Sequence, residues 1–164
     1  MRRNRTKKIT QLALIVAFAL MLSFVESRIP SPGIPGVKLG LANIAVIFAL
    51  YKLGIKEAVV ISLTRVLLMS MYFGFGMNTF YSVAGAVLSL SVMALLKKLT
   101  PLKEVAVSVT GGVMHNAGQL ILAMFVFDSA DVYYYMPFLA LSGTLAGIAI
   151  GVASAILVKR VKMQ

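Results

Sequence analysis

The sequence contains no cysteine and a single histidine, His115. Without cysteine there is no disulfide, no thiol nucleophile and no thiolate metal ligand. One histidine also falls short of the three or four protein ligands that a transition-metal site requires. We therefore predict neither a metal site nor a cofactor.

Acidic residues are scarce as well, with five Asp and Glu against sixteen Lys and Arg. The spacing of Asp128 and Asp131 could hold Mg²⁺ against a diphosphate, but a short acidic loop is the simpler interpretation. The sequence has no phosphate-binding P-loop and no nucleophile-elbow motif around a serine. The chain is therefore predicted not to be an enzyme.

Hydrophobic residues make up 60% of the chain and charged residues only 13%, whereas a soluble domain carries about 25% charged residues. A transmembrane helix needs about 20 apolar residues. Six apolar runs come close to that length, at residues 9–25, 39–53, 57–73, 79–96, 105–127 and 135–158. They predict an all-α integral membrane protein with six transmembrane helices. Residues 9–158 would form one membrane domain, between a basic N-terminus (1–8) and a basic tail (159–164).

The first apolar run follows a basic segment and could be read as a signal peptide. We favour a retained span, because the run is long for such a peptide and no clear small-x-small cleavage site follows it.

The basic residues predict the orientation of the chain. Thirteen of the sixteen lie in the two termini and in the two short joins after the second and fourth runs. They are Arg2, Arg3, Arg5, Lys7, Lys8, Lys52, Lys56, Lys97, Lys98, Lys103, Lys159, Arg160 and Lys162. With six spans these segments share one side, and the positive-inside rule makes that side cytoplasmic. The charge therefore marks a multi-pass protein of the cell membrane rather than a nucleic-acid binder.

Three basic residues do not fit that orientation signal: Arg28, Lys38 and Arg65. Arg65 lies eight residues into the third run, about 12 Å from its cytoplasmic end. A charge at that depth indicates function by default. The alternative is a structural arginine that is bonded to carbonyl groups or to an acidic neighbour.

The fifth run carries His115, Asn116 and Gln119, at a depth similar to that of Arg65. Three- and four-residue steps place Ser108, Gly111, His115 and Gln119 on one helix face. These side chains could bind a ligand, or they could form hydrogen bonds between helices. Asn78 could line the same cavity or cap a helix. Residues 44–50, 83–96 and 147–157, in the cytoplasmic halves of the second, fourth and sixth runs, contain no ionisable group. We therefore expect a closed, outward-facing cavity and not a channel.

Two tracks of small residues predict helix contacts. Gly143, Gly147 and Gly151 recur every four residues and favour packing within the bundle. Ala13 and Ala17 have the same spacing in the first run, beside the basic N-terminus, where a partner could dock.

The outer join before the second run is rich in glycine and proline, and it leads into the stretch Pro35-Gly36-Val37-Lys38-Leu39-Gly40-Leu41-Ala42-Asn43. This stretch resembles the heptaprenyl diphosphate synthase component I family, also called the Gx transporter family. Three further segments look similar to that family: Glu26-Ser27-Arg28-Ile29-Pro30, Leu63-Thr64-Arg65-Val66-Leu67 and His115-Asn116-Ala117-Gly118-Gln119.

The family in turn resembles the substrate-capture (S) components of energy-coupling factor (ECF) transporters. That resemblance implies six membrane helices, a vitamin-like ligand bound near the outer face, and partnership with a coupling subunit and two ATPases. It also implies that Ala13 and Ala17 contact the coupling subunit. The synthase name fits less well, because prenyl chain elongation needs clustered aspartates that this chain lacks.

Together these observations predict a membrane-embedded substrate-binding subunit for uptake of a small anionic or amphipathic molecule, such as a flavin, an isoprenoid diphosphate or a quinone precursor. The expected ligand-binding residues are Lys38, Asn43, Arg65, Asn78, His115, Asn116 and Gln119, under a loop that includes Glu26, Arg28, Gly33, Pro35 and Gly36. The alternative is a non-transport component that holds an isoprenoid for a soluble prenyl transferase.

Overall fold

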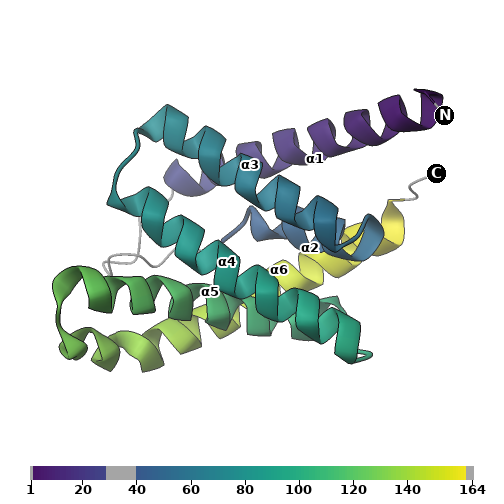
Figure 1. The fold of residues 1–164 in the computed structure, drawn as a ribbon. Coiled ribbons are helices and arrows are strands. Elements are labelled where there is room, and N and C mark those ends of the chain that lie inside the picture. Colours follow the sequence, from purple (N-terminus) through teal and green to yellow (C-terminus); the bar gives the residue numbers. More distant parts are fainter. Residues whose placement is uncertain (1, 29–39, 162–164) are drawn as a thin grey trace.

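The computed structural model describes residues 2–28 and 40–161, and within these ranges it contains only helices. They are α1 (Arg2–Arg28), α2 (Asn43–Lys52), α3 (Ile55–Phe73), α4 (Met77–Leu99), α5 (Glu104–Phe127), the short 3₁₀ helix η1 (Ala130–Tyr135) and α6 (Met136–Arg160). The all-α class is thus confirmed (Figure 1).

Four segments are long and apolar enough to cross a membrane: Thr6–Arg28, Met77–Leu99, Glu104–Phe127 and Asp131–Arg160. Helix α3 has 19 residues but carries Lys56, Glu57 and Arg65. Helix α2 has 10 residues, or about 15 Å, which is half the hydrocarbon thickness of a bilayer. Four helices of the described residues can therefore span a membrane by their length and composition, as in a helical membrane protein.

Helix α2 forms the centre of the bundle. Its residues from Ala45 to Leu50 are all buried, and they belong to one apolar cluster with residues of α1, α3, α4, α5 and α6. A short turn at Leu53–Gly54 leads into α3, and residues 100–103 join α4 to α5. As the sequence predicted, these short joins connect antiparallel neighbours (Figure 1).

Helices α5 and α6 pack most closely, along the glycine track of α6. A Cβ atom on Gly143 would lie 2.8 Å from the carbonyl oxygen of Gly112, and one on Gly147 would lie 2.6 Å from the Cα atom of Val109. A Cβ atom on Gly151 would lie 2.7 Å from the Cα atom of Val105. Real Cβ atoms do not approach backbone so closely, so only glycine permits this contact. The predicted packing role of the track is confirmed.

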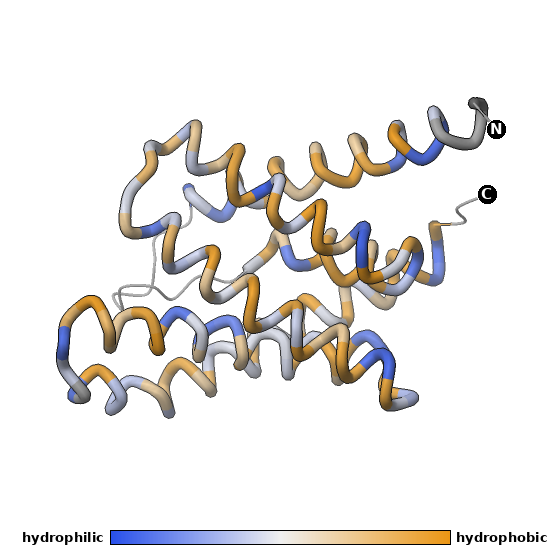
Figure 2. The backbone as a smooth tube through the Cα atoms, viewed as in Figure 1, coloured by the Kyte–Doolittle hydropathy of each residue, from blue (hydrophilic) through white to orange (hydrophobic). Residues whose placement is uncertain are grey.

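Both termini and the joins α2–α3 and α4–α5 lie at one end of the bundle, and the α3–α4 join and η1 lie at the other (Figure 1). We call these the basic end and the opposite end. Hydrophilic residues gather at the basic end (Figure 2). There Lys8 forms an ion pair with Glu57 and joins α1 to α3. Lys97 donates a hydrogen bond from Nζ to the carbonyl oxygen of Leu50 and so caps the C-terminus of α2.

Candidate functional site

At the opposite end of the bundle, the carboxylate of Glu26 joins the C-terminal end of α1 to the segment before α2. Oε1 of Glu26 accepts a hydrogen bond from the backbone N–H of Gly40. Gly40 has φ +72°, a left-handed conformation that glycine adopts without strain. A Cβ atom at this position would lie 3.1 Å from Nδ2 of Asn43. Glu26, Gly40 and Asn43 are therefore neighbours, although fourteen residues lie between the end of α1 and the start of α2 along the chain.

Arg65 lies in α3, within electrostatic reach of Glu26. Its Nε atom is buried and has no hydrogen-bond partner among the described residues. The side chain as a whole is half-buried, and Glu26 is the group that attracts it electrostatically. The Glu26 carboxylate thus serves two purposes, since it accepts the Gly40 N–H and partly balances the Arg65 charge. An anion beside Arg65 would find a donor that the described protein does not use.

His115 and Gln119 form a pair on α5, with 3.2 Å between Nε2 of His115 and Nε2 of Gln119. His115 lies against α4 at Gly85, where an added Cβ would come within 2.9 Å of the imidazole ring. Gly111, one turn earlier, faces Met93 of the same helix. This part of the polar face that the sequence predicted therefore points at α4. Ser108 does not share it, because its Cβ lies 2.9 Å from the position of a Cβ on Gly151 in α6.

Asn116 points toward α6 instead. Its Nδ2 donates hydrogen bonds to the carbonyl oxygen of Leu139 at 2.8 Å and to Oγ of Ser142 at 3.3 Å. Only 5% of Asn116 is exposed. The structure therefore separates Asn116 from its neighbours His115 and Gln119, and it engages the amide in joining α5 to α6.

Asn78 is the second residue of α4, and its side chain is exposed. The alternative of a helix cap is wrong, because the N-cap residue of α4 is Gly76. Arg28 is exposed at the last residue of α1, with Cζ 4.9 Å from the ring centroid of Phe24. Ala13 and Ala17 are exposed on α1. The remaining members of the predicted set, Gly33, Pro35, Gly36 and Lys38, lie outside the described residues.

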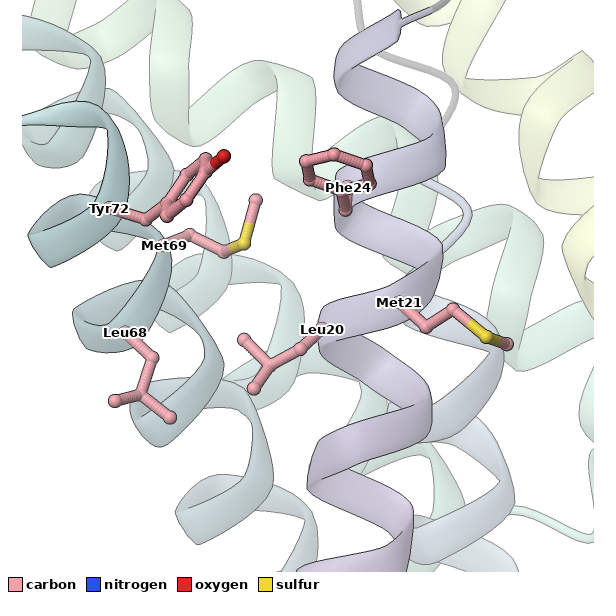
Figure 3. Close-up of a pocket in the computed structure, with 6 residues that line it drawn as sticks. All are labelled: Leu20, Met21, Phe24, Leu68, Met69 and Tyr72. Atoms are coloured by element: carbon pink, nitrogen blue, oxygen red, sulfur yellow. The ribbon is translucent and has the colours of Figure 1, made fainter.

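Two apolar grooves run along α3. One, of about 400 Å³, lies between α1 and α3 and is lined by Leu20, Met21, Phe24, Leu68, Met69 and Tyr72 (Figure 3). The other, of about 320 Å³, lies between α3 and α4 and is lined by Ile55, Val59, Leu63, Ala86, Val87, Leu90, Ser91 and Ala94. Neither groove is lined by a residue of the predicted set. Sequence reasoning missed them, because apolar residues at helical spacing are common to every span.

Comparison with known proteins identifies the family. The family model of heptaprenyl diphosphate synthase component I matches residues 15–157, from the middle of α1 almost to the end of α6. The chain belongs to this family. The match includes both partners of the Glu26–Gly40 hydrogen bond, Arg65 and the polar residues of α5. No curated protein and no solved structure matches the chain.

The match confirms the resemblance that the sequence showed to this family. The name of the family describes one component of heptaprenyl diphosphate synthesis. Together with the apolar helices, it makes the chain a membrane component of that family.

Proposed function

We propose that the chain is a substrate-binding subunit for uptake of a small anionic or amphipathic molecule, similar to the S components of ECF transporters. Arg65 and Lys38 would neutralise the charge of the ligand. Asn43, His115 and Gln119 would supply hydrogen bonds to it. On this proposal Asn116 is a brace between α5 and α6, and Asn78 lies at the rim.

The observation that carries the proposal is that the buried Nε atom of Arg65 has no hydrogen-bond partner among the described residues. Burying an arginine donor in a membrane protein without a hydrogen bond is costly, and such residues commonly mark ligand pathways. The Nε atom of Arg65 has no partner among the described residues, and Glu26 already accepts the Gly40 N–H. An anionic ligand would provide a hydrogen-bond acceptor for Nε of Arg65 and a negative charge to balance its guanidinium.

The membrane arrangement that goes with this function has six crossings of the cell membrane, both termini in the cytoplasm, and one domain over residues 9–158. Lysines and arginines of the α2–α3 join, the α4–α5 join and the end of α6 lie at the basic end of the bundle and support it. Helix α2 would cross together with the residues before it, because it is too short alone. The opposite end, with Glu26 and Gly40, would then face outward.

The partners would be a transmembrane coupling subunit and a pair of ATPases. The sequence contains no phosphate-binding loop for nucleotide hydrolysis, so energy would have to come from another chain. The exposed Ala13 and Ala17 on α1 offer a flat surface that a partner helix could approach closely.

The test is binding by the Arg65→Ala variant. The molecule that co-purifies with the full chain from its native membrane is identified by mass spectrometry, and its affinity is measured with both proteins. We expect Arg65→Ala to abolish binding while the helix content stays unchanged. Lys103→Ala, an exposed cation in the α4–α5 join, is the control and should bind normally. Unchanged affinity of Arg65→Ala would refute the proposal.

A second function is favoured by the family name: a non-catalytic membrane component that holds an isoprenoid diphosphate for a soluble prenyl transferase. Its partner would be the second component of the synthase. A cytosolic partner needs the polar site to face the cytoplasm, so the two functions differ in which side of the membrane Arg65 is reached from. Restoration of prenyl transferase activity by adding this chain to the soluble component would favour the second function.

A further inference from the structure

The groove between α1 and α3 is built from large apolar side chains on regular helix faces. On α3, Leu68, Met69 and Tyr72 follow three- and four-residue steps and therefore share one face. Phe24 of α1 meets Tyr72 edge to face, with 6.1 Å between the ring centroids. Leu20 of α1 points across toward α3 lower in the groove (Figure 3).

This groove has a positive charge at its rim. The guanidinium of Arg28 lies over the ring of Phe24, with Cζ 4.9 Å from the centroid, and Phe24 lines the groove. Arg28 is exposed, so its donors are accessible from outside. Arg65 precedes Leu68 by three residues and so begins the same face of α3. Arg28 therefore lies at the rim of the groove beside Phe24, and Arg65 lies one helical step beyond Leu68 on the face of α3 that lines it.

The groove between α3 and α4 provides an internal comparison. It is of similar size and is also apolar, and no charged residue lines either groove. The cations nearest to it, Lys56 and Lys98, lie one helical step from Val59 and Ala94, toward the basic end. Bulk lipid tails can fill either groove. At the opposite end of the bundle, the groove between α1 and α3 combines room for a hydrocarbon chain with a cation at its rim that would select an anionic headgroup.

We infer that the groove between α1 and α3 holds the hydrocarbon tail of an anionic amphiphile, with the anionic group of that molecule paired to Arg28. This inference rests on the proposed binding function and names the class and the entry point of its ligand: a tailed anion that enters sideways from the bilayer and meets Arg28 before it reaches Arg65, not a water-soluble vitamin. Arg28 ends α1, so it lies where the headgroup of such a molecule meets water. The tail follows the face from Tyr72 toward Leu68, into the membrane.

The experiment uses the full chain in phosphatidylcholine nanodiscs. The probe is dodecyl phosphate with a photoactivatable diazirine at the end of its tail, and the matched neutral probe is the corresponding dodecanol. After irradiation, the labelled residues are mapped by mass spectrometry. We expect dodecyl phosphate to label the groove between α1 and α3 about fivefold more than dodecanol does, the preference that one exposed ion pair supplies. Labelling between α3 and α4 should be the same in Arg28→Gln as in the native chain, because Arg28 does not adjoin that groove.

Two variants make the assignment specific. Met69→Trp should fill the groove and remove its labelling, whereas Met71→Trp, at an exposed methionine outside the groove, should not. Arg28→Gln changes an exposed residue and should erase the preference for phosphate over alcohol while leaving the dodecanol signal. If Met69→Trp fails to fold, Arg28→Gln still tests whether Arg28 selects the phosphate probe.

Labelling spread evenly over the exposed apolar surface, including that of α6, would overturn the inference and show bulk lipid alone. If Arg28→Gln is still labelled more strongly by dodecyl phosphate than by dodecanol, the inference is also overturned. Either failure is distinguishable from failure of the proposed function, since that function is tested separately by the affinity of Arg65→Ala for the co-purified molecule.

Discussion

Glu26 and Gly40 connect the end of α1 to the beginning of α2 through one hydrogen bond from the Gly40 N–H to the Glu26 carboxylate. The same carboxylate attracts Arg65 of α3. From the end of α1, one acidic side chain therefore bonds the segment before α2 and attracts an arginine of α3. Because the sequence has only five acidic residues, few other groups could take over this position.

Removing the Glu26 side chain should destabilise the protein through both contacts. Glu26→Ala leaves the Gly40 N–H without its acceptor and leaves Arg65 without its acidic neighbour. A lost acceptor for a partly buried donor costs about 1–3 kcal/mol. Thermal unfolding followed by circular dichroism in detergent measures the loss.

The Glu26→Gln variant separates the two contributions, because its side-chain oxygen can still accept the Gly40 N–H but carries no charge. In an Arg65→Ala background, Glu26→Gln should cost less than in the native chain, since the charge to be balanced is gone. Residues coupled in this way show interaction energies of about 0.5–3 kcal/mol. Equal costs in the two backgrounds would show that Glu26 acts on Gly40 alone.

Replacing Asn116 should weaken the bundle without affecting ligand binding. Asn116→Leu removes the hydrogen bonds to Leu139 and Ser142, so we expect a loss of about 1–2 kcal/mol in the free energy of unfolding. His115→Leu, one residue earlier, should instead lower the affinity for the co-purified molecule. Affinity measurements on both variants check this, and a loss of binding in Asn116→Leu would return that residue to the ligand site.

Hydropathy and charge predicted the helical class, the short antiparallel joins and the glycine contact of α6, because each depends on local sequence. They predicted helix ends less well. Helix α1 begins at Arg2 instead of near residue 9, since arginine and lysine are good helix formers and a helix does not stop where hydrocarbon ends. The 3₁₀ helix η1 was not predicted, although Ser129 caps its start by accepting from the Asp131 N–H.

The site was less predictable than the fold. Helical spacing placed Ser108 and His115 on one face, and Asn116 was grouped with them because it lies at a similar depth. In the structure, Ser108 and Asn116 point toward α6, whereas His115 points toward α4. A helix packed on two sides divides its polar residues between neighbours, and spacing alone does not show where the division falls. The Glu26–Gly40 bond was also beyond sequence reasoning, because it depends on how the chain returns between α1 and α2.

Enlarging Ala13 and Ala17 should impair assembly with a coupling subunit but spare ligand binding. Both residues are exposed on α1, so leucine fits there without disturbing the bundle. Co-purification of the double variant Ala13→Leu/Ala17→Leu with the coupling subunit measures assembly. The control is Leu14→Ala, which changes an exposed neighbour toward a smaller residue and should have a weaker effect. Undiminished co-purification of the double variant would exclude this surface as the docking site.

The orientation of the bundle can be tested with single cysteines, because the native sequence has none. Asn78 is exposed at the opposite end and Lys103 is exposed at the basic end. In intact cells, a membrane-impermeant maleimide should label Asn78→Cys and leave Lys103→Cys unlabelled, and permeabilised cells should label both. The positive-inside rule sets this expectation, since thirteen basic residues are assigned to the cytoplasmic segments. The reverse pattern would place Glu26 and Arg65 nearer the cytoplasm and favour service to a soluble prenyl transferase over uptake.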